Sequence, residues 1–361
     1  MTLPDAGYAH ALHCLQAIGP LRLKKIQAVF PVFRDAWEAP AGALAEALGD
    51  NALEELLKEK TRVNPEEEWK KLLQAQIRVV AETDKEYPQL LREMPQPPAL
   101  LYVRAHGTDT FDAKLHTVAV IGSRKASHYG RSVARAIAGE LAQAGVIVVS
   151  GLAIGIDAEA HEATLASKTP TWAVLGSGLN HIYPARNQPL ARAILEAGGA
   201  LLSEYHPEQE PAPFTFPQRN RVIAGLARVV LIVEAAERSG ALITARYALD
   251  ANREVAAVPG DIFALNSKGT NALLRRGAAL VRDAGDVLEL LGLSRGTETL
   301  SLDRFDEIEQ HILRCLHAPI TADELAITAE LSPQVLNQKL SLLELRGAIQ
   351  QSGGRFYRTN L

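Results

Sequence analysis

The amino-acid sequence predicts an α/β fold in which a doubly wound, mostly parallel sheet lies between two smaller helical modules. Two observations carry this prediction. From residue 115 to 291, short apolar runs rich in β-branched residues alternate with helix-length segments, and glycine-rich turns follow several of these runs. Short buried strands that alternate with helices are typical of parallel sheets covered on both faces.

Residues 1–80 predict a module of short helices. Ala9 to Ala17 is compatible with a helix that breaks at Gly19-Pro20, and further helical runs follow at 21–30, 44–57 and 65–76. The stretch 15–20 resembles the hairpin of helix-hairpin-helix and SAM-like modules, in which a glycine turn brings backbone amides to a phosphate. Ala17 stands where that hairpin usually has its first glycine. This substitution favours a structural or protein-docking module over one that contacts DNA.

Residues 81–114 are rich in proline, with Tyr87-Pro88, Pro95 and Pro97-Pro98 close together. Proline removes a backbone donor and disfavours the helical conformation of the residue before it. We therefore expect a linker, or an extended prelude to the next domain, with a lone strand at 100–103.

Residues 115–291 predict a Rossmann-like domain. The apolar runs that we expect to form its strands lie at 117–121, 146–149, 171–175, 200–203, 228–233, 254–258 and 279–281. Helix-length segments such as 131–144 and 242–251 separate them, which is the order of a parallel sheet with helical crossovers.

A polar linker at 292–303 leads to a last domain at 304–361. Helical patterns at 307–316, 321–328 and 332–346 precede two extended runs, 348–350 and 355–358, around a Ser352-Gly353-Gly354 turn. Three helices followed by a hairpin are the order of a winged helix. This domain has more acidic than basic residues, so we expect it to contact a protein at least as readily as duplex DNA.

Composition narrows the class of protein further. The chain has 361 residues, 47% apolar content and a net charge of −4, which predicts two or three domains and gives no overall sign of a nucleic-acid partner. Its two cysteines, Cys14 and Cys315, are too far apart in sequence for a disulfide framework or a thiolate metal site. No signal peptide or membrane span is recognisable, so we expect a soluble, cytoplasmic protein with no membrane partner.

Four glycine-rich turns follow predicted strands or begin predicted helices. In an open α/β sheet such turns lie at one edge, where backbone N–H groups converge on a crevice and neighbouring Arg and Lys favour phosphates. The turns are Ile121-Gly122-Ser123-Arg124-Lys125, Ser150–Gly155, Gly176-Ser177-Gly178 and Lys268-Gly269-Thr270-Asn271. They match neither the dinucleotide fingerprint nor a P-loop, because Gly176-Ser177-Gly178 lacks a third glycine and Lys268-Gly269-Thr270 reverses the required order.

Catalytic and metal-binding readings find little support. Asp157 and His161 are compatible with an acid–base pair, but a helix cap and a structural hydrogen bond are simpler roles. Glu234 follows a predicted strand and is more simply an ion-pair partner of a nearby arginine than a catalytic acid. We therefore expect no catalytic residue, no metal and no cofactor.

The loop 211–221 carries the more specific signal. Its prolines predict an extended backbone, and two phenylalanines stand just before Arg219-Asn220-Arg221. Exposed aromatic side chains beside cations form stacking platforms for single-stranded nucleic acids. Phe216, the nearer to the basic cluster, is the expected stacking residue. The alternative is a hydrophobic plug that packs on the end of the sheet.

Residues 115–290 resemble the DNA-processing protein A (DprA/Smf) family, and the flanking modules look like that family's appendages. The resemblance is carried by Ile121–Arg124, Ser150–Ala153 with Gly155-Ile156-Asp157 and His161, Val174–Gly178 with Tyr183-Pro184, Ser203-Glu204-Tyr205, Phe216–Arg221, Val233–Ala235 with Ser239-Gly240, Ala256–Gly260, and Gly269-Thr270-Asn271.

The resemblance implies a non-enzymatic protein of natural transformation. Such a protein binds and protects single-stranded DNA and loads the RecA recombinase onto it, usually as a homodimer. By position it implies that Gly122, Ser123, Arg124, Phe216, Arg219 and the turn 269–271 contact DNA. Asn220 joins them as a member of the basic cluster, and Lys268 on grounds of charge.

Two other functions stay open at this point. The fold also resembles that of LOG-type nucleotide phosphoribohydrolases, whose Pro-Gly-Gly-x-Gly-Thr-x-x-Glu loop supplies a catalytic acid. Here a longer insertion separates Pro259-Gly260 from Gly269-Thr270, and Leu273 stands at the position of the acid. The third reading is a protein-docking adaptor whose crevice has no ligand.

Overall fold

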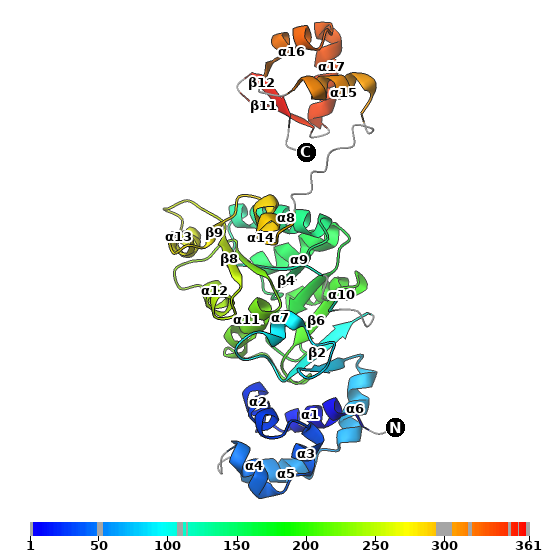
Figure 1. Ribbon diagram of the computed structural model, residues 1–361, viewed down its shortest axis with the longest axis vertical. Helices are drawn as coiled ribbons and strands as arrows, with labels where there is room; N and C mark the ends of the chain where they lie inside the picture. Colours follow the sequence, from blue (N-terminus) through cyan, green and yellow to red (C-terminus); the bar gives the residue numbers. More distant parts are fainter. Residues whose placement is uncertain are drawn as a thin grey trace. The chain divides into compact units, whose positions relative to one another are not determined.

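The computed structural model describes residues 3–48, 53–106, 111–112, 115–293, 305–316, 320–345, 348–352 and 354–358 (Figure 1). They belong to two compact units, of which the first ends at Leu293 and the second begins at Ser294. Most of the linker expected at 292–303 lies outside the described residues. No described helix is long and apolar enough to cross a membrane.

A nine-stranded sheet of order β1-β2-β6-β5-β4-β3-β7-β8-β9 forms the centre of the first unit. In the order in which they lie in the sheet, the seven strands β6, β5, β4, β3, β7, β8 and β9 are all parallel. This confirms the predicted Rossmann-like sheet. The bounds of these strands are β3 Thr117–Ile121, β4 Ile147–Ser150, β5 Thr171–Val174, β6 Ala200–Ser203, β7 Val229–Ile232, β8 Glu254–Ala257 and β9 Ala279–Leu280.

The proline-rich segment, expected as a linker or an extended prelude to the next domain, lies between two strands of the sheet. β1 (Arg78–Ala81) and β2 (Leu100–Ala105) pair antiparallel with each other, and β2 continues the sheet through β6, with Tyr102 opposite Ser203. The prolines lie between the two strands, around the short helix α7 (Gln89–Arg92), where they cost no sheet hydrogen bond. The strand expected to be alone is therefore paired on both sides.

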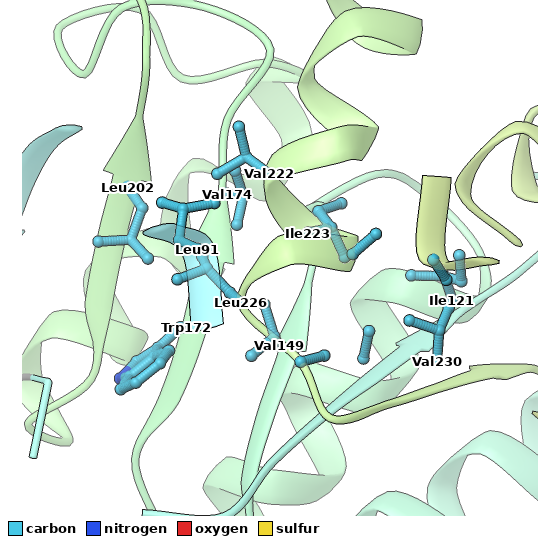
Figure 2. Packing of buried hydrophobic residues seen from close by; sticks show 14 of the residues in the cluster. Leu91, Ile121, Val149, Trp172, Val174, Leu202, Val222, Ile223, Leu226 and Val230 are labelled. Carbon is cyan, nitrogen blue, oxygen red and sulfur yellow. The ribbon is translucent and has the colours of Figure 1, made fainter. Parts of the chain in front are cut away.

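Helices cover both faces of the sheet. On one face, α7, α11 (Thr215–Gly225) and α12 (Gly240–Asp250) pack on the strands. Figure 2 shows Val222 and Ile223 of α11, and Leu226 directly after it, among the apolar side chains of this core. On the other face lie α8 (His128–Gln143), α9 (Ile156–Ala166) and α14 (Ala284–Leu290). The remaining elements of this region are α10 (Gln188–Glu196), α13 (Lys268–Arg275) and the short 3₁₀ helices at 185–187 and 265–267.

The N-terminal helices pack against the sheet. Leu12, Leu15 and Ile26 are fully or almost fully buried in one core with Leu100 and Leu201 of β2 and β6. The helices are α1 Asp5–His13, α2 Pro20–Val29, α3 Phe33–Glu38, α4 Ala41–Leu48, α5 Leu53–Lys60 and α6 Pro65–Gln74. The sequence did not indicate α3, and the single helix predicted at 44–57 is two helices on either side of residues 49–52, which lie outside the described residues.

The second unit is a winged helix, as its sequence predicts. Helices α15 (Glu307–Cys315) and α16 (Ala322–Thr328) both begin at capping boxes, formed by Asp306 with Glu309 and by Thr321 with Glu324. The other elements are α17 Pro333–Leu345 and a three-stranded sheet of β10 Ile320–Thr321, β12 Arg355–Arg358 and β11 Ile349–Ser352. Arg346 and Gly353, at the ends of predicted elements, lie outside the described residues.

Candidate functional site

A cleft of about 690 Å³ opens at the carboxyl edge of the sheet, above β3 and β7. β3 and β7 are neighbours in the sheet, but β4, which follows β3 in the chain, lies on the opposite side of β3 from β7. The strand order therefore changes direction between β3 and β7. Open α/β sheets bind ligands where this reversal leaves a crevice. Loops after β3, β4, β5, β6 and β7 all contribute to the lining of the cleft.

Two glycines allow the loop after β3 to lie close to α9. A Cβ atom at Gly122 would come within 2.7 Å of Ile156 Cγ1 and 2.9 Å of the Glu234 carbonyl oxygen. Gly155 has a φ of +86°, and a Cβ there would lie 2.3 Å from the Ser123 carbonyl oxygen. Gly122 and Ser123 line the cleft as predicted, but close packing, rather than an open backbone amide, is what requires glycine at 122 and 155.

Arg124, Phe216 and Tyr183 form a cation–aromatic platform on one wall of the cleft. The Arg124 guanidinium carbon lies 5.1 Å from the centre of the Phe216 ring, within the range of a cation–π contact. The Tyr183 and Phe216 ring centres are 5.3 Å apart, with the planes tilted by 43°. Arg124, Tyr183 and the neighbouring Lys125 are exposed, and Phe216 is half-buried.

The cations of this platform are available to a ligand. Among the residues that the structure describes, no carboxylate lies within 4.0 Å of the Arg124 or Lys125 side-chain nitrogens. Asn266 donates from Nδ2 to the Lys125 carbonyl oxygen (2.8 Å). This bond holds the backbone of the loop and does not involve the lysine side chain. The cleft therefore presents the Arg124 charge against an aromatic ring and a second positive charge, that of Lys125, in its lining.

The loop predicted to be extended is a helix from Thr215 onward. Pro217 falls in the first turn of α11, where a missing N–H costs no intrahelical hydrogen bond, so the proline does not stop the helix. Thr215 is buried, and its Oγ1 donates to Gly176 O and lies 2.8 Å from Ala212 O, which anchors the start of the helix. Phe216 is consequently held at a fixed place on α11 and does not move with a loop.

Arg219, which the resemblance implies as a DNA contact, borders the cleft but is almost entirely buried. It is 4% exposed, and its Nη1 donates to the carbonyl oxygens of Gly151 (2.7 Å) and Val174, which belong to the ends of β4 and β5. Burial lowers the pKa of Arg219 to about 10, so the side chain stays charged at neutral pH. The residue ties α11 to the sheet beneath the cleft.

The other members of the basic cluster differ in their surroundings. Arg221 is buried, pairs with Glu204 and donates to the Gln96 carbonyl oxygen, so it too is structural. Asn220 lines the cleft, where its Oδ1 accepts from Arg219 Nε (3.1 Å) and its Nδ2 donates weakly to Gly240 O (3.4 Å). Of Arg219-Asn220-Arg221, only Asn220 has a polar group directed at the site without deep burial.

The remaining glycine turns serve packing. A Cβ atom at Gly176 would lie 2.7 Å from Phe216 Cδ1, so this glycine makes room for the aromatic ring. The turn Lys268-Gly269-Thr270-Asn271 is not part of the lining of the cleft. Gly269 N donates to Ala235 O (2.8 Å), Thr270 is buried, and Asn271 bonds both backbone groups of Gly260; Lys268 alone is exposed.

The acidic residues near the cleft hold backbone and hydroxyl groups. Asp157 accepts from the Gly151 N–H (3.1 Å) and does not cap α9, contrary to the sequence-based interpretation. Burial raises its pKa, and the charge of Arg219 opposes that change. Glu234 accepts from the Ser127 N–H (2.9 Å) and hydroxyl at the start of α8, and weakly from Asn266 Nδ2 (3.4 Å); among the described residues no arginine pairs with it.

His161 makes the structural hydrogen bond that its sequence context favours. Thr171 Oγ1 donates to Val148 O (2.6 Å) and therefore accepts from His161 Nδ1 (2.9 Å), which places the histidine proton on Nδ1. Nε2 is buried and has no hydrogen-bond partner among the described residues. Burial, with a smaller effect of the Arg219 charge, lowers the pKa of His161 to about 3.

This environment predicts a loss of stability in weak acid. In weak acid His161 is protonated in the unfolded chain, where its pKa is about 6.5, but stays neutral in the folded chain. The free energy of unfolding should therefore fall below pH 6.5, and His161 should contribute about 1.4 kcal/mol of that loss at pH 5.5 relative to pH 8. Urea unfolding of wild type and His161→Asn at both pH values measures it. Equal pH dependence in the two proteins would contradict the assignment.

Sequence reasoning placed Lys125 in a turn at the crevice without naming it as a DNA contact, and it missed Tyr183 and Asn266 as lining residues. Lys125 directly follows Arg124, and Tyr183 follows the glycine turn after β5, so their positions at strand ends were a usable signal. Asn266 gave none, because its place beside Lys125 depends on the path of the chain after β8.

Two family models match the chain. DNA recombination-mediator protein A matches residues 78–292, and the DprA winged helix domain matches residues 296–355. Protein Smf from Synechocystis sp. is 36% identical over 296 residues, which are 81% of this chain and 74% of that protein. DNA processing protein DprA from Bacillus subtilis is 39% identical over 215 residues, 60% of this chain and 71% of that protein.

Two solved structures are similar as well. DNA processing protein A from Streptococcus pneumoniae has a TM-score of 0.67 at 33% identity and covers 78% of this chain and 97% of its own. DNA processing protein A from Helicobacter pylori, whose structure describes a single-stranded DNA binding mode of that protein, has a TM-score of 0.53 at 30% identity and covers 60% and 95%.

Proposed function

The chain belongs to the DNA recombination-mediator protein A family, and from this premise we propose that it binds single-stranded DNA in the cleft above β3 and β7. One observation carries the proposal: the Arg124 guanidinium lies over the Phe216 ring, which contacts Tyr183, and Lys125 lines the same cleft. Cations neutralise phosphates, and aromatic faces stack on any base, so the pair suits single strands without sequence preference. The H. pylori relative's DNA-binding mode supports the same ligand class.

The DNA contact belongs to the domain 115–291, with Gly122, Ser123, Arg124, Phe216 and Asn220 at the ligand. Arg219 acts from beneath by holding the strand ends in place. Lys268 is exposed beside the site and extends its positive surface, while the backbone of 269–271 keeps that neighbouring loop in place. The N-terminal helices and the winged helix serve as accessory modules.

We further propose that the protein protects this DNA and loads RecA onto it in natural transformation, as a homodimer in the cytoplasm and without catalysis. The carboxylates nearest the cleft support the absence of catalysis, because Asp157 and Glu234 are buried and bonded to backbone groups. RecA-dependent ATP hydrolysis on single-stranded DNA, measured with and without the protein, tests the loading step. A phosphoribohydrolase assay on nucleoside monophosphates tests the enzymatic alternative.

Single-stranded oligonucleotides should bind more tightly than blunt duplexes, whatever their sequence. Each phosphate neutralised should contribute about −0.7 to the slope of log affinity against log salt concentration. A salt series with fluorescently labelled single and double strands of equal length measures both quantities. Equal or tighter binding of the duplex contradicts the proposal, and absence of DNA binding at low salt favours a protein-docking adaptor.

A further inference from the structure

Three soft or borderline metal ligands meet between α1 and the segment after β6, away from the cleft. His10 and Cys14 are four residues apart at the end of α1, so their side chains lie on one face. His206 comes from the segment after β6. Cys14 Sγ lies 3.6 Å from His10 Nε2 and 3.2 Å from His206 Nε2, and one ligand atom from each residue lies within 4.8 Å of the other two.

These separations fit a single small cation. Around a tetrahedral zinc ion, with Zn–S about 2.3 Å and Zn–N about 2.0–2.1 Å, neighbouring ligand atoms lie roughly 3.3–3.6 Å apart. The two sulfur–nitrogen distances already lie within or close to that range. The His10 and His206 ring centres are 5.3 Å apart, and one ligand atom from each of the three residues already lies within 4.8 Å of the other two.

The surroundings orient His10 as a ligand. Tyr102, which is fully buried, has its hydroxyl 3.1 Å from His10 Nδ1 and 3.0 Å from His13 Nδ1. A hydrogen bond at Nδ1 fixes the ring and turns Nε2 toward Cys14, as outer-shell partners do in metal sites. On His206, Nδ1 accepts a hydrogen bond from the Glu208 N–H (3.2 Å). A metal ion at Nε2 requires the ring proton to be on Nδ1, so zinc binding costs this one exposed hydrogen bond.

We propose that His10, Cys14 and His206 bind one Zn²⁺ ion, which joins the N-terminal helical module to the sheet. Cys14 binds as the thiolate, its proton leaves to solvent, and a water takes the fourth position. Nitrogen and sulfur ligands favour zinc over Mg²⁺ or Ca²⁺, which require oxygen. The sequence predicted no metal and no thiolate metal site, because its two cysteines are far apart; the site proposed here needs only Cys14, and its third ligand, His206, lies 192 positions later.

Metal-free full-length protein, titrated with Zn²⁺ by calorimetry and with Co²⁺ by absorption, tests the proposal. We expect one ion per chain, a thiolate-to-cobalt charge-transfer band and a zinc-dependent rise in melting temperature. Cys14→Ser should abolish the band, and Tyr102→Phe should weaken zinc affinity about 10- to 100-fold. Cys315→Ser, which changes the other cysteine, should leave all three measurements unchanged.

Two results overturn the proposal. One is the absence of stoichiometric zinc binding in the wild-type chain, which needs no variant to interpret. The other is a cobalt band that persists in Cys14→Ser. Because the single-stranded DNA cleft contains none of these residues, loss of zinc binding with intact DNA binding separates this proposal from the proposed function.

Discussion

Replacing Arg219 by methionine should lower the free energy of unfolding by about 3–5 kcal/mol, the cost of removing one partner from a buried charged network. The guanidinium holds the carbonyl oxygens of Gly151 and Val174 and offsets the buried charge of Asp157. Methionine fills similar space but leaves those carbonyls unpaired and the carboxylate uncompensated. Urea unfolding at neutral pH measures the loss.

The matched control is the same change at an exposed arginine. Arg246 lies on the exposed side of α12, and Arg246→Met should change stability by less than about 0.5 kcal/mol. Adding Asp157→Asn to Arg219→Met should restore part of the loss, because the two charges are coupled. If Arg219→Met is as stable as Arg246→Met and loses only DNA affinity, Arg219 is a direct DNA contact, as the sequence predicts.

The parallel strands could be predicted because their signal is local. Runs such as Thr117–Ile121 and Val229–Ile232 are apolar and β-branched, and strands buried on both faces need little else to be recognised. The antiparallel edge could not, since β2 joins the sheet by pairing with β6, about 100 residues later. Proline density in that segment predicted an extended stretch and concealed both the strands on either side and the short helix α7 between them.

The site shows the same division. Arg124 sits in a short loop directly after a strand, so its exposure follows from its position at the sheet edge. Arg219 and Arg221 stand in a polar cluster that resembles a surface patch, but on a helix they are buried by contacts with Val174 and Glu204, from two other strand ends. No pattern within 211–221 encodes those partners. The position of Pro217 in the first turn of α11 likewise depends on a distant contact, the hydrogen bond from Thr215 Oγ1 to the Gly176 carbonyl oxygen.

The Arg124–Phe216 contact should combine a phosphate contact with base stacking, and the two contributions should be lost separately. Arg124→Ala should reduce the steepness of the salt slope by about 0.7, the share of one phosphate contact on a single strand. Phe216→Ala should weaken single-stranded DNA binding about 5- to 150-fold, equivalent to about 1–3 kcal/mol of stacking, with little change of slope. Because the Arg124 side chain lies on the Phe216 ring, the double variant should lose less than the sum of the two.

Conservative variants separate the parts of this contact. Arg124→Lys should keep the salt slope while losing the planar contact with the ring, and Phe216→Leu should keep the fold's apolar packing while losing the face for a base. Phe214→Ala is the matched aromatic control, since Phe214 is 62% exposed just before α11 and lies outside the cleft lining. Fluorescence anisotropy at several salt concentrations gives both affinity and slope. A Phe214→Ala loss equal to that of Phe216→Ala would move the stacking role away from the cleft wall, and a flattened slope in Phe216→Leu would show that the ring acts only by supporting Arg124.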